Sequence, residues 1–404
     1  MEQVRAKDVL ARLLDQHYEE AWQAKREGRP VGWVSSNFPQ EFIECFGLAV
    51  VYPENQTAAI AARHESMKLI EQSEELGYCA NICGYARVSL AFAEHGQCEA
   101  QNMPQPDFLL CSNNICHQLI KWFENIAKEK NIPMILWDAP LNNEYEVTPN
   151  RLQYLRDQSD YLIGELEKIS GKPFEQAKLD EVMAISNECG RQWNRAATLM
   201  ESTPSPINGF EMFNHMAVMV CARGRRETAE ALKLLADEMQ ARYDAGETTF
   251  RGEPRFRIMT EGISCWPHLR HNAGLLKESG MNMTATVYTE TWGRTYDTLD
   301  EMLVSYSVVL DNINLERATD RRVRLAQRAN CDGILIHLNR SCKAWNGFLF
   351  EMERGIKART GLPTAMYDGD QADPRCYSEM QVETRIQGFR ELMESRKEAA
   401  DGTL

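Results

Sequence analysis

The 404-residue sequence lacks the features that mark several common protein classes. It contains no apolar run of about 18 residues, the least that a membrane-spanning helix requires. Its first residues, MEQVRAKDVLARLL, lack the apolar block of a secretory signal. We therefore expect a cytoplasmic protein with no membrane partner. An excess of positive charge is also absent, since the formal net charge is −14, and this argues against nucleic acid as a partner.

Cysteine pairs with the CxxC spacing are absent as well, although the chain contains twelve cysteines. None of them forms the CxxC pair that is typical of zinc ribbons and thioredoxin-like proteins. Cytoplasmic thiols stay reduced, so disulfides do not explain so many cysteines. Some of these cysteines are therefore expected to bind metal. The composition is otherwise that of an ordinary globular protein, with 43% hydrophobic and 26% charged residues, and the length suggests two or three domains.

Short apolar runs predict eight parallel strands in two groups of four, most of them separated by helical patterns. The runs are residues 30–36, 47–55, 106–114 and 132–140, and then residues 255–262, 282–290, 331–341 and 362–370. Their details repeat, because Asp107 to Cys116, a helix and a Pro-led strand parallel Asp332 to Cys342, a helix and a second Pro-led strand. This indicates an internal duplication.

We predict an α/β fold with two duplicated, doubly wound parallel-sheet domains of flavodoxin- or Rossmann-like type. The predicted parts are an N-terminal domain over residues 1–150, a helical bridging region over 151–250 and a C-terminal domain over 251–404. Leucines and an isoleucine between residues 152 and 169 recur at helical spacing in the bridging region. Its Met-rich segment, residues 210–220, is predicted to pack in the core.

Ligands of open parallel sheets bind beyond the carboxyl ends of the strands. Cys116 and Cys342 occupy equivalent places there, each at the start of a helix, where the helix dipole favours a thiolate. Cys83 is a plausible third metal ligand, with Cys79 as a competitor. Other thiols fall inside predicted strands or on helix faces, where a cysteine is usually a small buried hydrophobe: Cys45, Cys111, Cys189 and Cys221.

Six motifs, in order along the chain, resemble the 2-hydroxyacyl-CoA dehydratase and benzoyl-CoA reductase family. The resemblance covers residues from about 30 to 395 and is greatest to the α-type subunits of the dehydratases. The motifs are SSNFPQEF, VVYPEN, NICGYAR, SNNICHQLIKWFE, HLNRSCKAW and DGDQADPRCYSEMQVETRIQG.

The resemblance implies a 4Fe-4S cluster held by Cys83, Cys116 and Cys342, with one iron open to water or substrate. It implies no flavin or NAD. It also implies that Ser36 is a hydroxyl near the open iron and that Glu54 is an acid/base near the substrate, with Ser35 as an alternative to Ser36. Taken alone, without the resemblance, Ser36 and Glu54 are better explained as caps of the helices that follow them.

The implied reaction eliminates water from an (R)-2-hydroxyacyl-CoA to give an (E)-2-enoyl-CoA through a ketyl radical that one injected electron starts. The implied partners are a paralogous second subunit, an ATP-dependent iron–sulfur activator and the acyl-CoA. Arg87 and Arg340, beside two of the cysteines, are expected to tune the cluster potential. The alternatives are a subunit of a ring-reducing benzoyl-CoA reductase and a subunit that only relays electrons.

Overall fold

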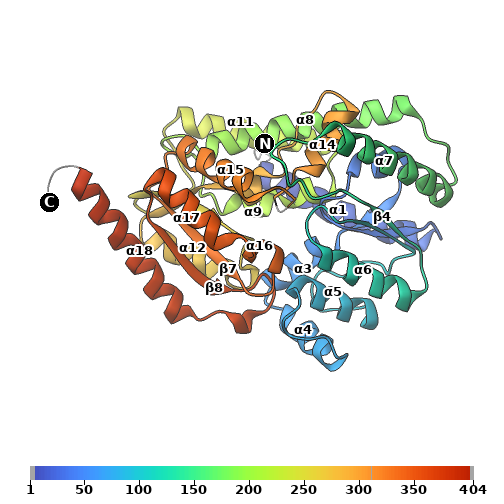
Figure 1. Ribbon diagram of the computed structural model, residues 1–404, viewed down its shortest axis with the longest axis horizontal. Coiled ribbons are helices and arrows are strands. Elements are labelled where there is room, and N and C mark those ends of the chain that lie inside the picture. Colours follow the sequence, from blue (N-terminus) through green and yellow to red (C-terminus); the bar gives the residue numbers. More distant parts are fainter. Residues whose placement is uncertain (1–4, 311, 401–404) are drawn as a thin grey trace.

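The computed structural model describes residues 5–310 and 312–400. Within them the chain forms two α/β lobes and a group of helices that contacts both (Figure 1). No helix of the described residues is both long and apolar enough to cross a membrane. Each lobe contains one four-stranded parallel sheet, so the predicted fold class is confirmed.

The sheet of the N-terminal lobe has the strand order β2-β1-β3-β4. Its strands are β1 (Val31–Val34), β2 (Ala49–Val51), β3 (Phe108–Ser112) and β4 (Met134–Trp137). Its helices are α1 (Ala6–Arg26), α2 (Gln40–Phe46), α3 (Pro53–Ala62), α4 (Ser66–Glu75), α5 (Gly84–His95) and α6 (His117–Lys130). Strands β1 and β3 are buried along their whole length, as is usual for central strands covered on both faces.

The sheet of the C-terminal lobe repeats this order as β6-β5-β7-β8. Its strands are β5 (Phe256–Glu261), β6 (Met281–Thr286), β7 (Gly333–Asn339) and β8 (Thr364–Gly369). Its helical segments are η1 (Trp266–His268), α12 (Leu269–Glu278), α13 (Val287–Glu290), α14 (Leu299–Ser307), α15 (Leu315–Arg328), α16 (Lys343–Asn346), α17 (Leu349–Thr360), η2 (Pro374–Cys376) and α18 (Glu379–Ala400).

Two aspartates show the duplication at the level of single hydrogen bonds. The N–H of Asp107 donates to the carbonyl of Val31 at 2.7 Å, and its carboxylate accepts the N–H of Val31 at 2.9 Å. Asp332 makes the same pair of bonds with Arg257, at 2.7 and 2.8 Å. Each aspartate thus fixes the start of a central strand against its neighbour, which explains why both units retain it.

Two of the predicted strands end earlier than expected. Residues 52–55 do not extend β2, because Pro53 begins α3, and proline is well suited to the first position of a helix. Residues 287–290 form α13 because the side chain of Thr286 accepts the N–H of Tyr288 and caps that helix. The apolar residues after these two strands therefore belong to helix starts.

Five helices separate the two sheets in the sequence. They are α7 (Pro149–Ser170), α8 (Gln176–Met200), α9 (Glu211–His215), α10 (Ala217–Cys221) and α11 (Arg226–Asp244). Helices α8 and α11 lie side by side along the upper edge of Figure 1. Helix α8 contacts α2 of one lobe and β6 of the other, so this region bridges the two sheets. The domain boundaries near residues 150 and 250 stay a prediction.

A buried arginine joins all three parts of the chain. Arg223, just after α10, pairs with Glu41 of α2 at 3.3 Å and donates to the hydroxyl of Ser186 in α8 at 2.6 Å. It also donates to the backbone carbonyls of Trp292 and Arg294 in the C-terminal lobe, at 2.8 and 2.6 Å. The two side chains of the ion pair are only 1% and 0% exposed. Their mutual compensation is what makes the burial of either charge tolerable.

Candidate active site

One large cavity, of about 1020 Å³, lies where the two lobes and the bridging helices meet. Its walls come from the loops after β1, β2 and β3, from the matching loops of the C-terminal lobe, and from α1, α9, α10 and α11. Carboxyl ends of strands thus surround it, as expected for a ligand site in doubly wound sheets. All five predicted site residues line this cavity: Ser36, Glu54, Cys83, Cys116 and Cys342.

The three cysteines, called the cysteine trio below, share one structural position. Cys83 immediately precedes α5, Cys116 precedes α6 and Cys342 precedes the one-turn helix α16. Each is the N-cap residue, where backbone N–H groups favour negative charge on sulfur. Two of the three come from the N-terminal lobe and one from the C-terminal lobe, so the trio exists only when the lobes are together.

One hydrogen bond between the lobes and one within the C-terminal lobe hold the loops that carry Cys83 and Cys342. The N–H of Gly84 donates to the hydroxyl of Ser341 at 2.9 Å, and the N–H of Ser341 donates to Asp370 at 3.2 Å. A Cβ on Gly84 would lie 2.4 Å from a carboxylate oxygen of Asp370, so only glycine permits this approach. The neighbours of the cysteines therefore fix the distance between the lobes.

The sulfur of Cys83 lies among hydrogen-bond donors. Gln371 Nε2, in the loop after β8, donates to it at 2.9 Å, and the N–H groups of Tyr85 and Ala86 also point to it. Burial, and then the nearby Cys116, raise the pKa of the Cys83 thiol to about 12, while these N–H groups act in the opposite direction. A thiolate here needs a positive partner such as a metal, and its donors are already in place.

The residues present fit an iron–sulfur cluster on several grounds. Thiolates are the ligands of such clusters, and all three cysteines line one cavity. Among the described residues, the buried Gln371 already donates through Nε2 to the Cys83 sulfur, which favours the thiolate form that a cluster needs. In that part of the chain no three His, Cys, Asp or Glu side chains are placed to hold one metal ion. A four-iron cluster binds each cysteine to a different iron, so its ligands stand farther apart than those of a single ion.

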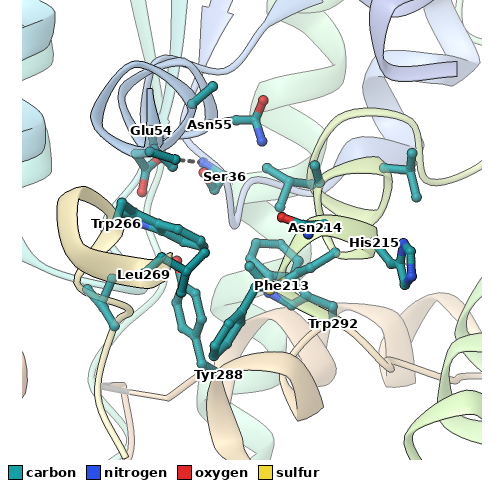
Figure 2. A pocket seen from close by; sticks show the side chains of 18 of the residues that line it. Ser36, Glu54, Asn55, Phe213, Asn214, His215, Trp266, Leu269, Tyr288 and Trp292 are labelled. Atoms are coloured by element: carbon teal, nitrogen blue, oxygen red, sulfur yellow. Dashed lines mark hydrogen bonds between the residues drawn. The ribbon is translucent and has the colours of Figure 1, made fainter. Parts of the chain in front are cut away.

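Ser36 and Glu54 form a hydrogen-bonded pair on the cavity wall, as Figure 2 shows. The N–H of Ser36 donates to Glu54 Oε2 at 2.6 Å. Burial raises the pKa of Glu54, and hydrogen bonds from the backbone and side chain of Ser36 only partly offset this. A carboxyl group with a raised pKa exchanges protons more readily near neutral pH.

The structure does not support the capping roles considered for these two residues. The N-cap of α3 is Tyr52, and the carboxylate of Glu54 is turned to the backbone of Ser36, outside its own helix. The N-cap of α2 is Pro39, so Ser36 does not cap that helix. Ser35 is fully buried and accepts the N–H of Ser112 at 3.0 Å, which turns it into the sheet and leaves Ser36 facing the cavity.

Three other sequence candidates lie outside the cavity lining. Cys79 is exposed, and of the two cysteines in its loop only Cys83 reaches the cavity. The guanidinium of Arg87 is buried and pairs with Glu74 at 3.0 Å and Asp373 at 2.9 Å, so its charge is neutralised. Arg340 is exposed and lies 3.4 Å from Asp368. Tuning of a cluster by these two arginines stays a prediction, weakened by their acidic partners.

Several cavity residues were not identified from the sequence. The Met-rich segment packs in the core through Met212 and Met219, as predicted, yet Phe213 and Asn214 between them line the cavity. Helix α1 also contributes, through residues 7–14, and so does Gln371. The only sequence signal for Gln371 was its place after a strand end. Nothing local distinguishes Phe213 from a core residue, because its role depends on distant segments.

Comparison with known proteins places these residues in context. Residues 35–393 match the family model described as 2-hydroxyglutaryl-CoA dehydratase, D-component. The chain is 49% identical to the (R)-phenyllactyl-CoA dehydratase alpha subunit of Clostridium sporogenes, over 98% of this chain and 97% of the relative. It is also 49% identical to the (R)-2-hydroxyisocaproyl-CoA dehydratase alpha subunit of Clostridioides difficile, over the full length of both. A benzoyl-CoA reductase subunit of Thauera aromatica is 26% identical over 98% of this chain and 95% of that protein.

Proposed function

Because the chain belongs to the 2-hydroxyglutaryl-CoA dehydratase D-component family, we propose that it is the α-type subunit of an iron–sulfur (R)-2-hydroxyacyl-CoA dehydratase, a hydro-lyase. The relatives at 49% identity are named as dehydratase subunits, whereas the ring-reducing relative is 26% identical. The identities therefore favour dehydration over ring reduction.

One observation carries the proposal: the cysteine trio and the Ser36–Glu54 pair line the same cavity. A relay of electrons would need the cysteines alone. A hydroxyl and a carboxyl group with a raised pKa beside them provide for proton transfer to a bound molecule. The combination is that of a catalytic subunit.

Cys83, Cys116 and Cys342 would hold a 4Fe-4S cluster. Such a cluster, with three protein ligands on four irons, supplies a Lewis-acidic iron corner and a store for one electron. Gln371 and the N–H groups of Tyr85 and Ala86 would stabilise the charge on the Cys83 sulfur by hydrogen bonding. The lobes must stay closed to keep the three ligands together.

The polar pair performs the proton transfer in this proposal. Dehydration removes hydroxide from C2 of the acyl group and a proton from C3. Glu54 accepts hydrogen bonds from the N–H and the hydroxyl of Ser36, and its carboxyl group is the one that takes up or returns a proton. To donate to the substrate oxygen, the Ser36 hydroxyl would turn away from Glu54. The aromatic residues of the cavity, among them Trp266 and Tyr288, exclude water from this exchange.

The proposal includes partners that the described chain does not contain. The relatives are named alpha subunits, so a second, paralogous subunit is expected in the assembly. An ATP-dependent iron–sulfur activator would inject the electron that forms the ketyl radical and starts the reaction, and the same electron returns at its end. We place the enzyme in the cytoplasm of an anaerobe, without flavin or NAD.

The test is anaerobic turnover of the complete enzyme with its activator. The purified complex should contain iron and acid-labile sulfide, and each injected electron should support many cycles of enoyl-CoA formation. Consumption of reductant in proportion to product, with benzoyl-CoA as substrate, would instead indicate a ring reductase. A preparation that assembles correctly but contains no iron or sulfide would refute the cluster.

A further inference from the structure

Positive charge is confined to one end of the cavity. Of the described residues that line it, only four are lysine or arginine. Arg5 and Lys7 lie at the start of α1, Arg242 lies in the last turn of α11, and Arg251 lies in the loop that follows α11. The end that contains Ser36 has no cation among them.

Several contacts show that these segments lie together. Helix α1 packs against α11, and the N–H of Ala6 donates to Glu238 of α11 at 2.7 Å. His215 lies between them: burial, then the charges of Arg242 and Lys7, lower its pKa to about 4, so this imidazole stays neutral. The N–H of Asn208 donates to Thr249 at 2.9 Å and brings the loop of Arg251 to the same wall.

Two of the four cations have acidic partners and two do not. Arg5 lies 3.3 Å from Asp8, and Arg242 lies 3.2 Å from Glu238. Lys7 and Arg251 are exposed and form no ion pair within the described residues. Their charges are therefore available to an anion that enters the cavity.

We propose that this end, called the cationic mouth and defined by Arg5, Lys7, Arg242 and Arg251, binds the phosphate groups of the coenzyme A part of the substrate. The inference rests on the proposed function. A CoA thioester carries its phosphates far from its reacting carbons, and Figure 2 shows His215, which lies near Lys7 and Arg242, on the other side of the view from Glu54. A chain with a net charge of −14 otherwise repels a polyanion, so a local cationic surface is needed.

The test compares a 2-hydroxyacyl-CoA with the pantetheine thioester of the same acid, which lacks the phosphorylated nucleotide. In the complete enzyme, Lys7→Ser/Arg251→Ser should lower kcat/KM for the CoA thioester by about 10-fold or more, with the loss mainly in KM. The pantetheine thioester should lose less than about 2-fold. Raising the salt concentration should weaken the wild-type enzyme more than the variant.

The matched control is Lys178→Ser/Arg226→Ser, which removes two exposed cations outside the cavity lining. It should leave both substrates and the iron content unchanged. Equal losses with both thioesters in the Lys7/Arg251 variant, or no loss with either, would overturn the assignment. A wild-type enzyme that dehydrates neither thioester would refute the proposed function instead.

A second inference rests on the opposite end of the cavity. Figure 2 shows Phe213, Trp266 and Tyr288 across from Ser36 and Glu54. Their rings pack together, with centroids 5.9 Å apart for Phe213 and Trp266, 6.2 Å for Phe213 and Tyr288, and 6.3 Å for Trp266 and Tyr288. These three residues are called the aromatic wall.

We infer that the acyl side chain of the substrate packs against the aromatic wall and is apolar and bulky, either branched aliphatic or aromatic. This also rests on the proposed function. A second carboxylate on the acyl group would be buried beside Glu54 with no cation of the described lining to pair with it, which is strongly unfavourable. A methyl group would leave the wall without contacts.

The complete enzyme should be assayed with 2-hydroxyisocaproyl-CoA, phenyllactyl-CoA, lactoyl-CoA and 2-hydroxyglutaryl-CoA. We expect kcat/KM for the first two to exceed that for lactoyl-CoA by about 10-fold and that for 2-hydroxyglutaryl-CoA by about 100-fold. Phe213→Ala should reduce the preference over lactoyl-CoA by about 10-fold. Phe46→Ala, an equally buried phenylalanine outside the cavity, should not change the ratio.

A higher kcat/KM for 2-hydroxyglutaryl-CoA or lactoyl-CoA than for the bulky apolar substrates would overturn this inference while leaving the dehydratase assignment intact. An unchanged preference in Phe213→Ala would remove the aromatic wall as its origin. Absence of dehydration with all four substrates, in an enzyme with full iron content, would refute the proposed function.

Discussion

Two glutamates, the half-buried Glu54 and the fully buried Glu41, allow a sharp test of the proposed chemistry, because their pKa values are shifted in opposite directions. Glu54 lines the cavity, and burial raises its pKa. Glu41 lies outside the cavity lining. Burial also acts to raise its pKa, but the charge of Arg223 and hydrogen bonds from Ser186 and Tyr296 outweigh this and lower it. We compare Glu54→Gln with Glu41→Gln.

Replacement of Glu54 should reduce activity without reducing stability. Loss of a general acid/base typically slows a reaction by about 10² to 10⁴, or about 2.7–5.4 kcal/mol of barrier. A raised folded-state pKa means that the contribution of Glu54 to stability falls as pH rises from its ordinary value of 4.5 to the raised value. At pH 7 the ionised carboxylate of Glu54 is less favourable in the folded protein than in the unfolded one. Glutamine removes this unfavourable contribution and can still accept the N–H of Ser36, so the midpoint of thermal unfolding should stay equal or rise.

Replacement of Glu41 should have the opposite effect. Its lowered pKa means that its stabilising contribution is present above the ordinary value of 4.5 and is lost as pH falls through the lowered value. Glutamine leaves Arg223 buried without its counter-charge, at a cost of about 3–5 kcal/mol. Unfolding entropy grows with chain length, and for 404 residues it corresponds to roughly 1.2 °C per kcal/mol, so the midpoint of thermal unfolding should fall by at least about 3 °C at pH 7.

The assay combines anaerobic dehydration rates, iron content and thermal unfolding of both variants from pH 5 to 8. Iron content shows whether the metal site survives each change. Wild-type turnover in Glu54→Gln would contradict the proton-transfer role. A midpoint for Glu54→Gln that falls as far as that of Glu41→Gln, with activity lost in the same proportion, would show that Glu54 is structural.

Three further substitutions test the cysteine trio, the contact between the lobes at Gly84 and the buried Arg322–Glu261 ion pair. Cys342→Ser should lose iron and activity, whereas Cys189→Ser, buried in α8 outside the cavity, should keep both; equal iron loss would contradict the ligand assignment. Gly84→Ala puts a Cβ 2.4 Å from a carboxylate oxygen of the other lobe, so the enzyme should retain less iron after purification. Arg322→Met leaves Glu261 buried without a cation and should cost about 3–5 kcal/mol in urea unfolding, and Arg322→Met/Glu261→Gln should recover most of it.

The sheets were predictable from the sequence because their signals are local. Every strand overlaps an expected apolar run, and the parallel order follows from the intervening helices. The ends of β2 and β6 were less predictable, since Pro53 and Thr286 start helices inside runs that look extended. Cys116 and Cys342 were placed correctly in the fold because each follows a strand and precedes a helix.

The rest of the cavity depends on contacts between distant segments. Gln371 contacts Cys83 across 288 residues of sequence, and no pattern near Gln371 indicates this. Lys7 belongs to a helix that looks like any amphipathic surface helix, and its place at the cavity depends on the packing of α1 against α11. Local sequence patterns therefore do not identify the charged and aromatic residues that line the cavity, because contacts between distant segments bring them together.

The duplicated fold also explains why the site is asymmetric. The turn after the third strand of each lobe supplies one cysteine, Cys116 or Cys342, so symmetry alone would give an even number of thiolates. Cys83 breaks that symmetry and makes the number three, which would leave the proposed four-iron cluster with one corner that has no protein ligand. The helix after the second strand differs in the same way: it presents Glu54 in one lobe and Tyr288 in the other. In the proposed enzyme, one lobe would therefore supply the proton-transfer groups and the other an apolar surface, and a substrate between them would contact both.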